Sequence, residues 1–289
     1  MNAAPDPLFD RPIFIVSTPR SGSTLLFETL ARAPGLYTIG GESHRLIESI
    51  PQLNIRASDY ASNRLLAQDA VPPVVTELRQ RFRGRLLDRE GKAADAGHGR
   101  LRMLEKTPKN SLRIPFLMQA FPEARFVFLY RDPRQVLASM LEAWKSGRFK
   151  TYAGLPGWPL EHWSLLLTPG WRSLAGKPLI DIVAGQWQAA TEVLLDDVAA
   201  LPPDRCVPIR YGDFVAEPAA QVARLCAALG LDWDRPLGSA LPLARHTVTR
   251  PDPEKWRTHA AAIDSVLPGL AATIARAERA VGAPAPAAA

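Results

Sequence analysis

The chain has 289 residues, of which 47% are hydrophobic and 22% are charged, so it can form one large α/β domain or two small ones. No apolar run approaches the roughly 18 residues that a membrane span needs, and "MNAAPDPLFD" at the start lacks the basic and apolar regions of a secretory signal. The two cysteines, Cys206 and Cys226, lack metal-ligand spacing and form no disulfide framework. These features predict a reduced, cytoplasmic protein without a membrane span or a metal site.

The formal net charge of +6 leaves three interpretations of the basic surface: a surface without function, a nucleic-acid site, or a field that concentrates a small polyanion. A nucleic-acid site would need a basic stripe or a recognised module. The densest arginine cluster, over 77–90, has acids interleaved at helical spacing and is typical of a solvated helix face. We therefore expect no nucleic-acid partner.

The first half of the chain alternates short apolar runs with amphipathic segments. An apolar run that stops at a proline is typical of a buried strand, and apolar residues at helical spacing are typical of a helix. In chain order, this half is predicted to contain a strand over 11–19, helices over 22–35 and 40–50, a helix over 72–91 that ends at Gly91, a surface loop over 92–99, a strand over 101–104, and a turn and helix over 105–124.

The second half continues this alternation but interrupts it twice. The stretch "TYAGLPGWPLEHWSLLLTPGW" holds three tryptophans among Gly and Pro breaks and is too irregular for a regular element. In chain order, we expect a strand over 125–133, a helix over 134–147, an irregular segment over 148–178, a helix over 179–201, a strand over 205–211, a helix over 217–230, an irregular segment over 231–257, a helix from about His259, and a disordered tail over 283–289.

Short apolar strands that alternate with helices predict the fold class. We expect a single α/β domain over 1–282, with a P-loop-like three-layer fold in which a central parallel sheet carries helices on both faces. Ligands of such folds bind at the carboxyl ends of the strands. The loop after the first strand and Arg131, at the end of the strongest strand, should therefore lie at the same edge.

The loop "STPRSGSTLL" has the composition of an anion-binding turn. Its small residues Ser21, Gly22, Ser23 and Thr24 let backbone N–H groups approach an anion, and the following helix adds its positive N-terminal dipole. The structural alternative is a capped helix start, but Arg20 among these residues needs an anionic partner. The nucleotide triphosphatase pattern GxxxxGK[ST] is absent, which favours an oxyanion bound without a metal ion.

Several motifs in the same order resemble those of the sulfotransferases that use 3′-phosphoadenosine-5′-phosphosulfate (PAPS). "STPRSGSTLL" resembles the family's 5′-phosphosulfate loop, and "FVFLYRDPRQVLASM" resembles its 3′-phosphate motif. "PIRYGDFVAEP" is similar to a later strand-and-tyrosine element, and "TRPDPEKW" is a weaker match. The resemblance extends from Ile13 to Trp256 and includes the tyrosylprotein-like and bacterial branches, where arginine is common at the position of Arg20.

The resemblance implies a set of PAPS-binding residues. Arg20, Ser21, Gly22, Ser23, Thr24 and Leu25 would wrap the 5′-phosphosulfate, Arg131 and Ser139 would bind the 3′-phosphate, Tyr211 would support the adenine or the sugar, and Lys255 with Trp256 would belong to a closing C-terminal loop. The alternatives are an ion pair with Asp132 for Arg131 and helix packing for Ser139.

The motif "LEKTPKN" and the stretch "IGGESHRLIES" supply the catalytic candidates. The resemblance implies that Lys106 approaches the transferring sulfate; its alternatives are an ion pair with Glu105 or solvent exposure. The base that takes the acceptor proton would be Glu42, which follows two glycines, with His44 as the second choice and Glu48 also within reach.

The implied reaction is in-line transfer of the sulfuryl group of PAPS to a hydroxyl, with release of adenosine 3′,5′-bisphosphate and without a metal ion. Arginine at position 20 argues against simple phenols and steroids as acceptors. The tryptophan-rich stretch resembles sulfotransferase domains attached to polyketide synthases, which favours a small or carrier-bound hydroxyl, covered by 148–178 and 231–257. The alternatives are a P-loop kinase or NTPase and a non-catalytic nucleotide-binding protein.

Overall fold

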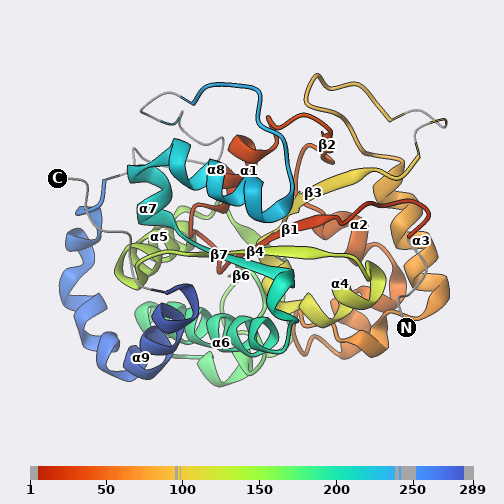
Figure 1. Ribbon diagram of the computed structural model, residues 1–289. Coiled ribbons are helices and arrows are strands. Elements are labelled where there is room, and N and C mark those ends of the chain that lie inside the picture. Colours follow the sequence, from red (N-terminus) through yellow and green to blue (C-terminus); the bar gives the residue numbers. More distant parts are fainter. Residues whose placement is uncertain (1–5, 95–96, 98, 238–240, 242–251, 283–289) are drawn as a thin grey trace.

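A five-stranded parallel sheet forms the centre of the computed structural model, which describes residues 6–94, 97, 99–237, 241 and 252–282 (Figure 1). Its strands lie in the order β2-β3-β1-β4-β7. They are β1 (Ile13–Val16), β2 (Leu36–Tyr37), β3 (Arg102–Lys106), β4 (Arg125–Tyr130) and β7 (Cys206–Arg210). Ile13 of β1 pairs with Leu104 of β3 on one side and with Arg125 of β4 on the other. All four strand pairings are parallel, as the alternation with helices predicts.

Helices cover both faces of this sheet, because successive strand residues point to opposite sides. Ile13 and Ile15 of β1 pack into one apolar layer, and Phe14 and Val16 into the other. The first layer contains α1 (Ser23–Leu30), α7 (Tyr211–Ala216) and α8 (Pro218–Leu229), and the second contains α2 (His44–Glu48), α3 (Pro72–Arg83), α4 (Ile114–Ala120), α6 (Leu179–Ala199) and α9 (Ala260–Val281) (Figure 1). The predicted α/β fold class is confirmed.

The predicted helix over 72–91 is wrong in its last two turns. Helix α3 ends at Arg83, and Gly84 follows it. Beyond this glycine the backbone of Leu87 exchanges two hydrogen bonds of 2.8 Å with Thr38, which lies just after β2. Glycine disfavours helix continuation, and pairing with a distant segment supplies the backbone partners that a helix would otherwise give.

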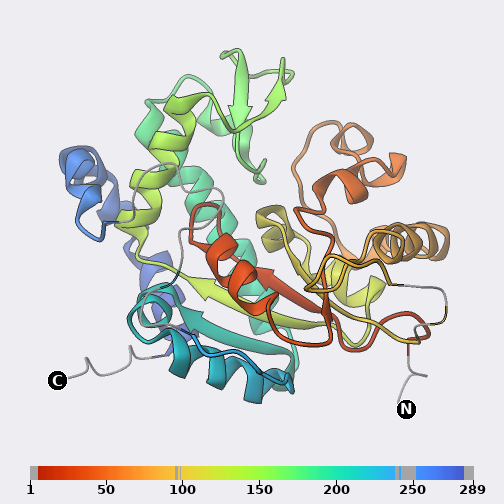
Figure 2. The same cartoon turned by 90° about the horizontal axis from the view of Figure 1, so that it is seen from above.

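The expectation of no regular element over 148–178 is also wrong. Strands β5 (Lys150–Ala153) and β6 (His162–Ser164) pair as an antiparallel hairpin that projects beyond α5 (Pro133–Ser146) (Figure 2). Trp158, Trp163 and Trp171 lie buried beneath it and contact one another edge to face, with ring centroids 4.7–6.1 Å apart. Trp144 of α5 contacts Trp158 and Trp163, so the hairpin shares this apolar core with α5 and α6.

The C-terminal helix α9 packs along α6, and its buried residues are Ile263, Leu270, Thr273 and Ala277. The stretch Lys255–Val281 is the one part of the described chain that passes as a membrane span by length and composition, with a mean hydropathy of 1.2. The predicted absence of a membrane span therefore stays a prediction. Residues 238–240 and 242–251, which belong to the predicted irregular segment 231–257, and the predicted tail over 283–289 lie outside the described residues.

Candidate active site

The candidate residues form a row along the carboxyl edge of the sheet. Each strand contributes one of them, and the strand order fixes their sequence in space: Glu42 after β2, Lys106 on β3, Arg20 after β1, Arg131 after β4 and Tyr211 after β7. Neighbouring strands lie about 4.8 Å apart, so the row spans roughly 20 Å. The sheet thus places two possible reaction partners, Glu42 and Lys106, at one end and Arg131 and Tyr211 at the other.

Two residues of the loop after β1 have a left-handed backbone conformation. Arg20 has a φ of 65°, which is rare for a residue with a side chain, and Gly22 has a φ of 92°. A Cβ atom on Gly22 would stand 2.2 Å from the ring of Tyr211. Glycine is therefore required here for two reasons, its left-handed backbone and the ring that lies against it. No described side chain caps the following helix α1, so its first N–H groups stay available for an anion.

Two guanidinium groups flank this loop without a carboxylate partner among the described residues. Arg20 donates through Nε to Ser139 Oγ at 3.1 Å, and its guanidinium lies 4.7 Å from the centre of the Phe149 ring. Arg131 donates to Gln135 and to the carbonyl of Arg20, and it stacks 4.6 Å from the ring of Tyr211.

The two guanidinium groups also act on each other. Burial, followed by the charge of Arg131, lowers the pKa of Arg20, and burial lowers the pKa of Arg131. Asp132 does not pair with Arg131 but caps α5, where it accepts from two backbone N–H groups. Two partly buried cations that repel each other favour an anion between them.

The remaining loop residues take different places. The Ser21 hydroxyl is buried and bonded to Thr18 Oγ1 at 2.8 Å. The side chain of Leu25 packs into the core beside α1, and its N–H donates to the Gly22 carbonyl at 3.0 Å. Thr24 is partly exposed at the start of the helix, whereas Ser23 is buried there. Backbone N–H groups before Leu25 are thus better placed to meet an anion than the Ser21 hydroxyl.

Lys106 and Glu42 meet at the other end of the row. Lys106 Nζ donates to Glu42 Oε1 at 2.7 Å, and His44 Nδ1 lies 3.6 Å from Glu42 Oε2. The lysine side chain is only 4% exposed, so it neither points into solvent nor pairs with Glu105. Burial acts to raise the pKa of Glu42, but His44 and Lys106 outweigh it and bring the value from 4.5 down to about 2. Glu42 is therefore ionised at neutral pH.

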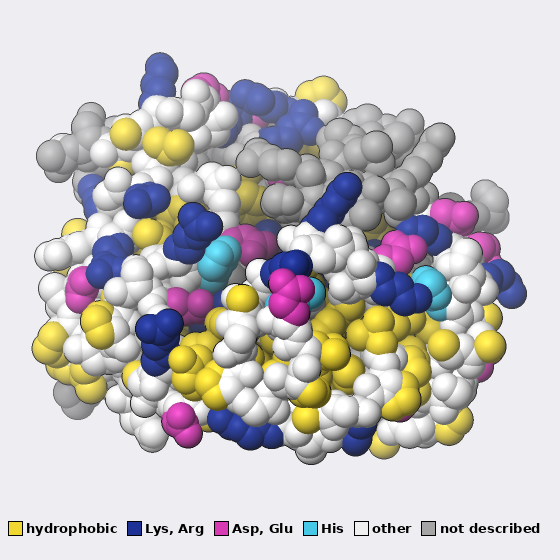
Figure 3. Space-filling view, turned by 180° about the vertical axis from the view of Figure 1, so that it is seen from behind, with side chains coloured by type: hydrophobic (Ala, Val, Ile, Leu, Met, Phe, Trp, Pro, Cys, Tyr) yellow, Lys and Arg dark blue, Asp and Glu magenta, His cyan; other side chains and the backbone are white. Residues whose placement is uncertain are grey.

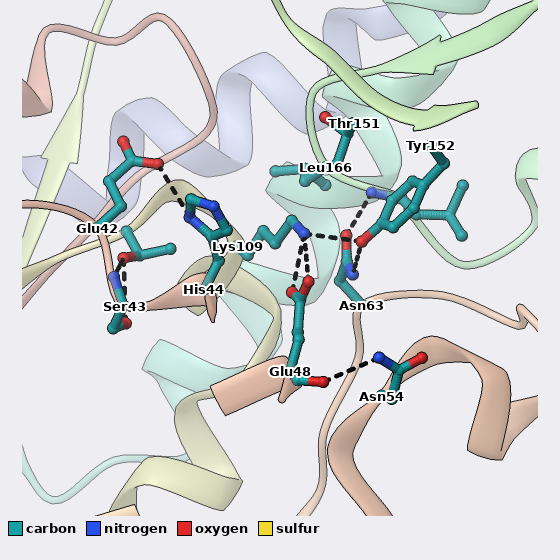
Figure 4. Close-up of polar contacts among 12 residues, drawn as sticks. Glu42, Ser43, His44, Glu48, Asn54, Asn63, Lys109, Thr151, Tyr152 and Leu166 are labelled. Atoms are coloured by element: carbon teal, nitrogen blue, oxygen red, sulfur yellow. Dashed lines mark hydrogen bonds and ion pairs between the residues drawn. The ribbon is translucent and has the colours of Figure 1, made fainter. Parts of the chain in front are cut away.

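The third acid of the same stretch, Glu48, is engaged elsewhere (Figure 4). It accepts from Lys109 Nζ with both oxygens at 2.8 Å and from Arg113 at 2.6 Å. Lys109 also donates to the hydroxyl of Tyr152 at 2.7 Å, and burial lowers the pKa of this lysine to about 8. With three donors on its carboxylate, Glu48 is poorly suited to take a proton from a substrate.

Lys255 and Trp256 lie against α5 rather than in the row itself. Lys255 Nζ is 2.6 Å from Glu142 Oε2, and the guanidinium of Arg134 lies 5.4 Å from the ring of Trp256. Glu142 also acts on the charge of Arg20, so Lys255 is near the loop after β1. Their predicted roles stay predictions.

A parallel sheet with a glycine-containing anion loop after its central strand defines an α/β protein of the P-loop-like class. Residues 12–235 match the sequence profile described as the sulfotransferase family, and the chain therefore belongs to that family. The motif resemblance from Ile13 onward is thereby confirmed at the level of the family.

Two curated relatives show the range of the match. The chain is 24% identical over 226 residues to protein-tyrosine sulfotransferase A of Caenorhabditis elegans, which covers 77% of this chain and 50% of that protein. It is 27% identical over 126 residues to the omega-hydroxy-beta-dihydromenaquinone-9 sulfotransferase Stf3 of Mycobacterium tuberculosis, which covers 44% and 28%. The chain spans about half the length, or less, of these relatives.

Solved structures resemble the fold over nearly the whole chain. The sulfotransferase domain of the Synechococcus PCC 7002 olefin synthase aligns with a TM-score of 0.50 and 20% identity, covering 96% of this chain and 98% of that one. A sulfotransferase from Alicyclobacillus acidocaldarius aligns with a TM-score of 0.50 and 16% identity, covering 94% and 96%. At these identities the likeness concerns the fold.

Sequence reasoning missed several residues that contact the row. Phe149, which covers Arg20, belongs to the segment that showed no pattern. Gln135 stands four residues after Arg131, a helical spacing that could have indicated their contact. Glu105, Thr107 and Asn110 belong to the motif "EKTPKN", of which only the lysine was singled out.

Proposed function

We propose that this chain transfers the sulfuryl group of PAPS to a hydroxyl of a small or carrier-bound metabolite and releases adenosine 3′,5′-bisphosphate. One observation carries the proposal: Arg20 and Arg131 flank the glycine turn without a described carboxylate, in the same row as the Lys106–Glu42 pair. A nucleotide with an anionic group at each end supplies two separate anions to such a row. Family membership supports sulfuryl transfer in particular.

The end of the row that holds Arg131 and Tyr211 suits the 3′-phosphate of the donor. Arg131 offers a planar fork of N–H donors beside Ser139 on α5, and arginine binds phosphate oxygens through such a fork. In the present structure Ser139 Oγ accepts from Arg20, so its single proton is free to turn toward a phosphate oxygen. Tyr211, stacked under Arg131 and against Gly22, joins this end of the site to the phosphosulfate loop.

The end of the row that holds Glu42 and Lys106 suits the transfer of the sulfuryl group. PAPS supplies an activated sulfuryl group on its 5′-phosphate. Arg20, Lys106 and the first N–H groups of α1 would hold the oxygens on which negative charge develops, and fixed donors of this kind stabilise a transition state without reorganising. Glu42, ionised and aimed at Lys106 from the turn at Gly40 and Gly41, would take the acceptor proton.

The Lys106–Glu42 ion pair also controls how strong this base is. A carboxylate with a pKa of about 2 is a weak base, and Lys106 is one of the two groups that lower it. If the ammonium turns toward a sulfuryl oxygen, that influence weakens while burial continues to raise the pKa. Glu42 would then become a stronger base only when the donor is in place. His44, 3.6 Å from the same carboxylate, is the alternative base.

The acceptor is proposed from the chemistry of the relatives and the shape of the chain. Their names describe transfer to a protein tyrosine and to an omega-hydroxy menaquinone, both of which carry a hydroxyl. The hairpin β5–β6 brings Phe149 to Arg20 and Tyr152 to Lys109, so it borders the acceptor end of the row. Trp158, Trp163 and Trp171 of this segment are buried, so other side chains of the hairpin would meet the acceptor.

The proposal includes neither a nucleic-acid nor a metal partner. On the face shown in Figure 3, Lys and Arg side chains lie scattered among acidic ones and form no continuous stripe. Within the described part of the chain, no group of three or more His, Cys, Asp or Glu side chains could hold a metal ion. We propose that neither nucleic acid nor Mg²⁺-ATP is the ligand, since the loop after β1 lacks the GxxxxGK[ST] pattern. The two cysteines are free, in keeping with the proposed cytoplasmic location.

The test is transfer of labelled sulfate from PAPS to a panel of hydroxyl compounds, including phenols, primary alcohols and hydroxyacyl groups on a carrier protein. We expect labelled product with at least one acceptor class, without added metal ion, and at least tenfold less with Glu42→Gln. Phosphoryl transfer from ATP that requires Mg²⁺ would instead favour the kinase alternative. Tight binding of the bisphosphate without transfer to any acceptor would favour a non-catalytic nucleotide-binding protein.

A further inference from the structure

Three residues of the motif "EKTPKN" take no part in the proposed chemistry and are nevertheless fully enclosed. Glu105, Thr107 and Asn110 are exposed by 0%, 1% and 0%. Burying a carboxyl group away from solvent is costly unless new hydrogen bonds replace those that it made to water. Glu105 has such bonds: it accepts from the Thr107 hydroxyl at 2.5 Å and from the Asn110 amide at 2.6 Å. The motif thus builds a closed polar cluster directly beside Lys106.

This cluster reaches across to the segment that carries Glu42. The backbone N–H of Ser43 donates to Thr107 Oγ1 at 2.7 Å, although the two residues are 64 positions apart. A hydroxyl has one proton, and that of Thr107 is given to Glu105, so its oxygen is left to accept from Ser43. Glu105 therefore fixes which way the threonine hydroxyl points.

The bonded residues are the immediate neighbours of the proposed reaction partners. Ser43 follows Glu42, and Thr107 follows Lys106, so the Ser43–Thr107 bond joins the two backbones next to the 2.7 Å ion pair. Pro108 holds Thr107 in an extended conformation, with φ of −141° and ψ of 124°. Both ends of the ion pair are thereby attached to one rigid support.

We propose that Thr107, oriented by Glu105, is a positioning residue that holds Glu42 against Lys106. The proposal rests on the proposed function, because it assigns Thr107 no contact with the substrate. Glu42 also faces His44 and interacts with the charges of Arg20 and Lys109, so its setting depends on several groups besides Lys106. A threonine that merely stabilised the fold would leave the ionisation of Glu42 unchanged.

The test compares Thr107→Val with Thr107→Ser. Valine keeps the shape of threonine but can neither donate to Glu105 nor accept from Ser43, whereas serine keeps the hydroxyl. For Thr107→Val we expect kcat for sulfate transfer to fall at least tenfold, with Kd for adenosine 3′,5′-bisphosphate within about twofold. We also expect an acid limb in kcat/KM to move up toward the ordinary carboxyl value. Thr107→Ser should restore kcat and the wild-type pH profile.

Several results with the Thr107 variants would overturn the positioning role. An unchanged kcat and pH profile in Thr107→Val, with an active wild type, overturns the positioning role but leaves the proposed function standing. A wild type that transfers no sulfate removes both. If Thr107→Val does not fold, Thr107→Ala replaces it with the same expected shift. If neither folds while Thr107→Ser does, the hydroxyl serves the fold alone and the proposal fails.

Discussion

Two pairs of cationic side chains lie at the same edge of the sheet but have different hydrogen-bond partners. Lys109 and Arg113 share the carboxylate of Glu48, which bonds to both at 2.6–2.8 Å. Arg20 and Arg131 have no carboxylate partner among the described residues and bond instead to Ser139, Gln135 and a backbone carbonyl. The first pair is partly neutralised within the fold and holds segments together, whereas we propose that the second pair binds an anionic ligand.

Burial and charge do not distinguish the two pairs, but their partners do. Both pairs are at least half-buried, and burial lowers the pKa of Arg20, Arg131 and Lys109 alike. The presence of a carboxylate therefore separates the two pairs better than burial or charge does.

The largest effect is expected from Glu42→Gln. General-base catalysis contributes about 10²–10⁴-fold, so kcat for sulfate transfer should fall by that factor, while Kd for adenosine 3′,5′-bisphosphate stays near the wild-type value. Single-turnover kinetics and calorimetry measure the two quantities. His44→Ala serves as the comparison variant, and a larger loss of kcat there than in Glu42→Gln would give the role of base to His44.

Glu48→Ala should cost stability instead of binding. It leaves Lys109 and Arg113, with side chains 9% and 1% exposed, without their carboxylate. Removing one partner of a buried ion pair costs about 3–5 kcal/mol of unfolding free energy. Urea unfolding measures the loss. Asp196→Ala, which breaks a surface ion pair with Arg276, is the matched control and should cost less than about 1 kcal/mol. Equal losses in both variants would refute the structural role of Glu48.

Arg131→Ala should cost binding instead of stability. One charged hydrogen bond contributes roughly 1.5–3 kcal/mol, which corresponds to about 10–150-fold in affinity. We expect this loss for adenosine 3′,5′-bisphosphate and little change for AMP, because only the former has a 3′-phosphate. Calorimetric titration of both nucleotides checks it. A variant that still prefers the bisphosphate as strongly as the wild type does would remove Arg131 from the 3′-phosphate site.

The smallest effect is expected when the pH is lowered in assays of the wild-type chain. A carboxyl group whose pKa is lowered stays ionised until the pH falls through that value, which for Glu42 is about 2. In the ligand-free enzyme, kcat/KM should therefore change less than about twofold between pH 7 and pH 5 on account of Glu42. A pH–rate profile with an acid limb near 4.5 would show that Lys106 and His44 do not hold this carboxylate in solution. A limb that disappears in His44→Ala would belong to the histidine.

The sequence was sufficient to predict four of the five strands, all except β2, and the position of the loop after β1. Strands β1 and β4 are continuous apolar runs that end shortly before Arg20 and Arg131, so these two residues were predicted to lie at the same edge of the sheet. The hydrogen bond from Arg131 to the carbonyl of Arg20 confirms this prediction. Strands with a strong local pattern can be predicted without knowing the tertiary structure, and so can the loops that directly follow them.

The contacts between distant segments could not be predicted in the same way. Glu42 meets Lys106 because β2 lies beside β3, and the strand β2 has only two residues and no pattern of its own. The wrong end of α3 and the missed hairpin have the same cause: Leu87 pairs with Thr38, and the tryptophans of 148–178 pack against one another. Partners far along the chain decided these elements, and local residue preferences did not.

The most direct test of the two arginines is the affinity of the unaltered chain for adenosine 3′,5′-bisphosphate and for AMP, measured by calorimetry with and without a chelator. We expect the bisphosphate to bind at least about tenfold more tightly, since a second phosphate engages Arg131, and the chelator to change neither value. Equal affinity for the two nucleotides, or binding that appears only with ATP and Mg²⁺, would contradict the assignment of Arg20 and Arg131 to the two ends of PAPS.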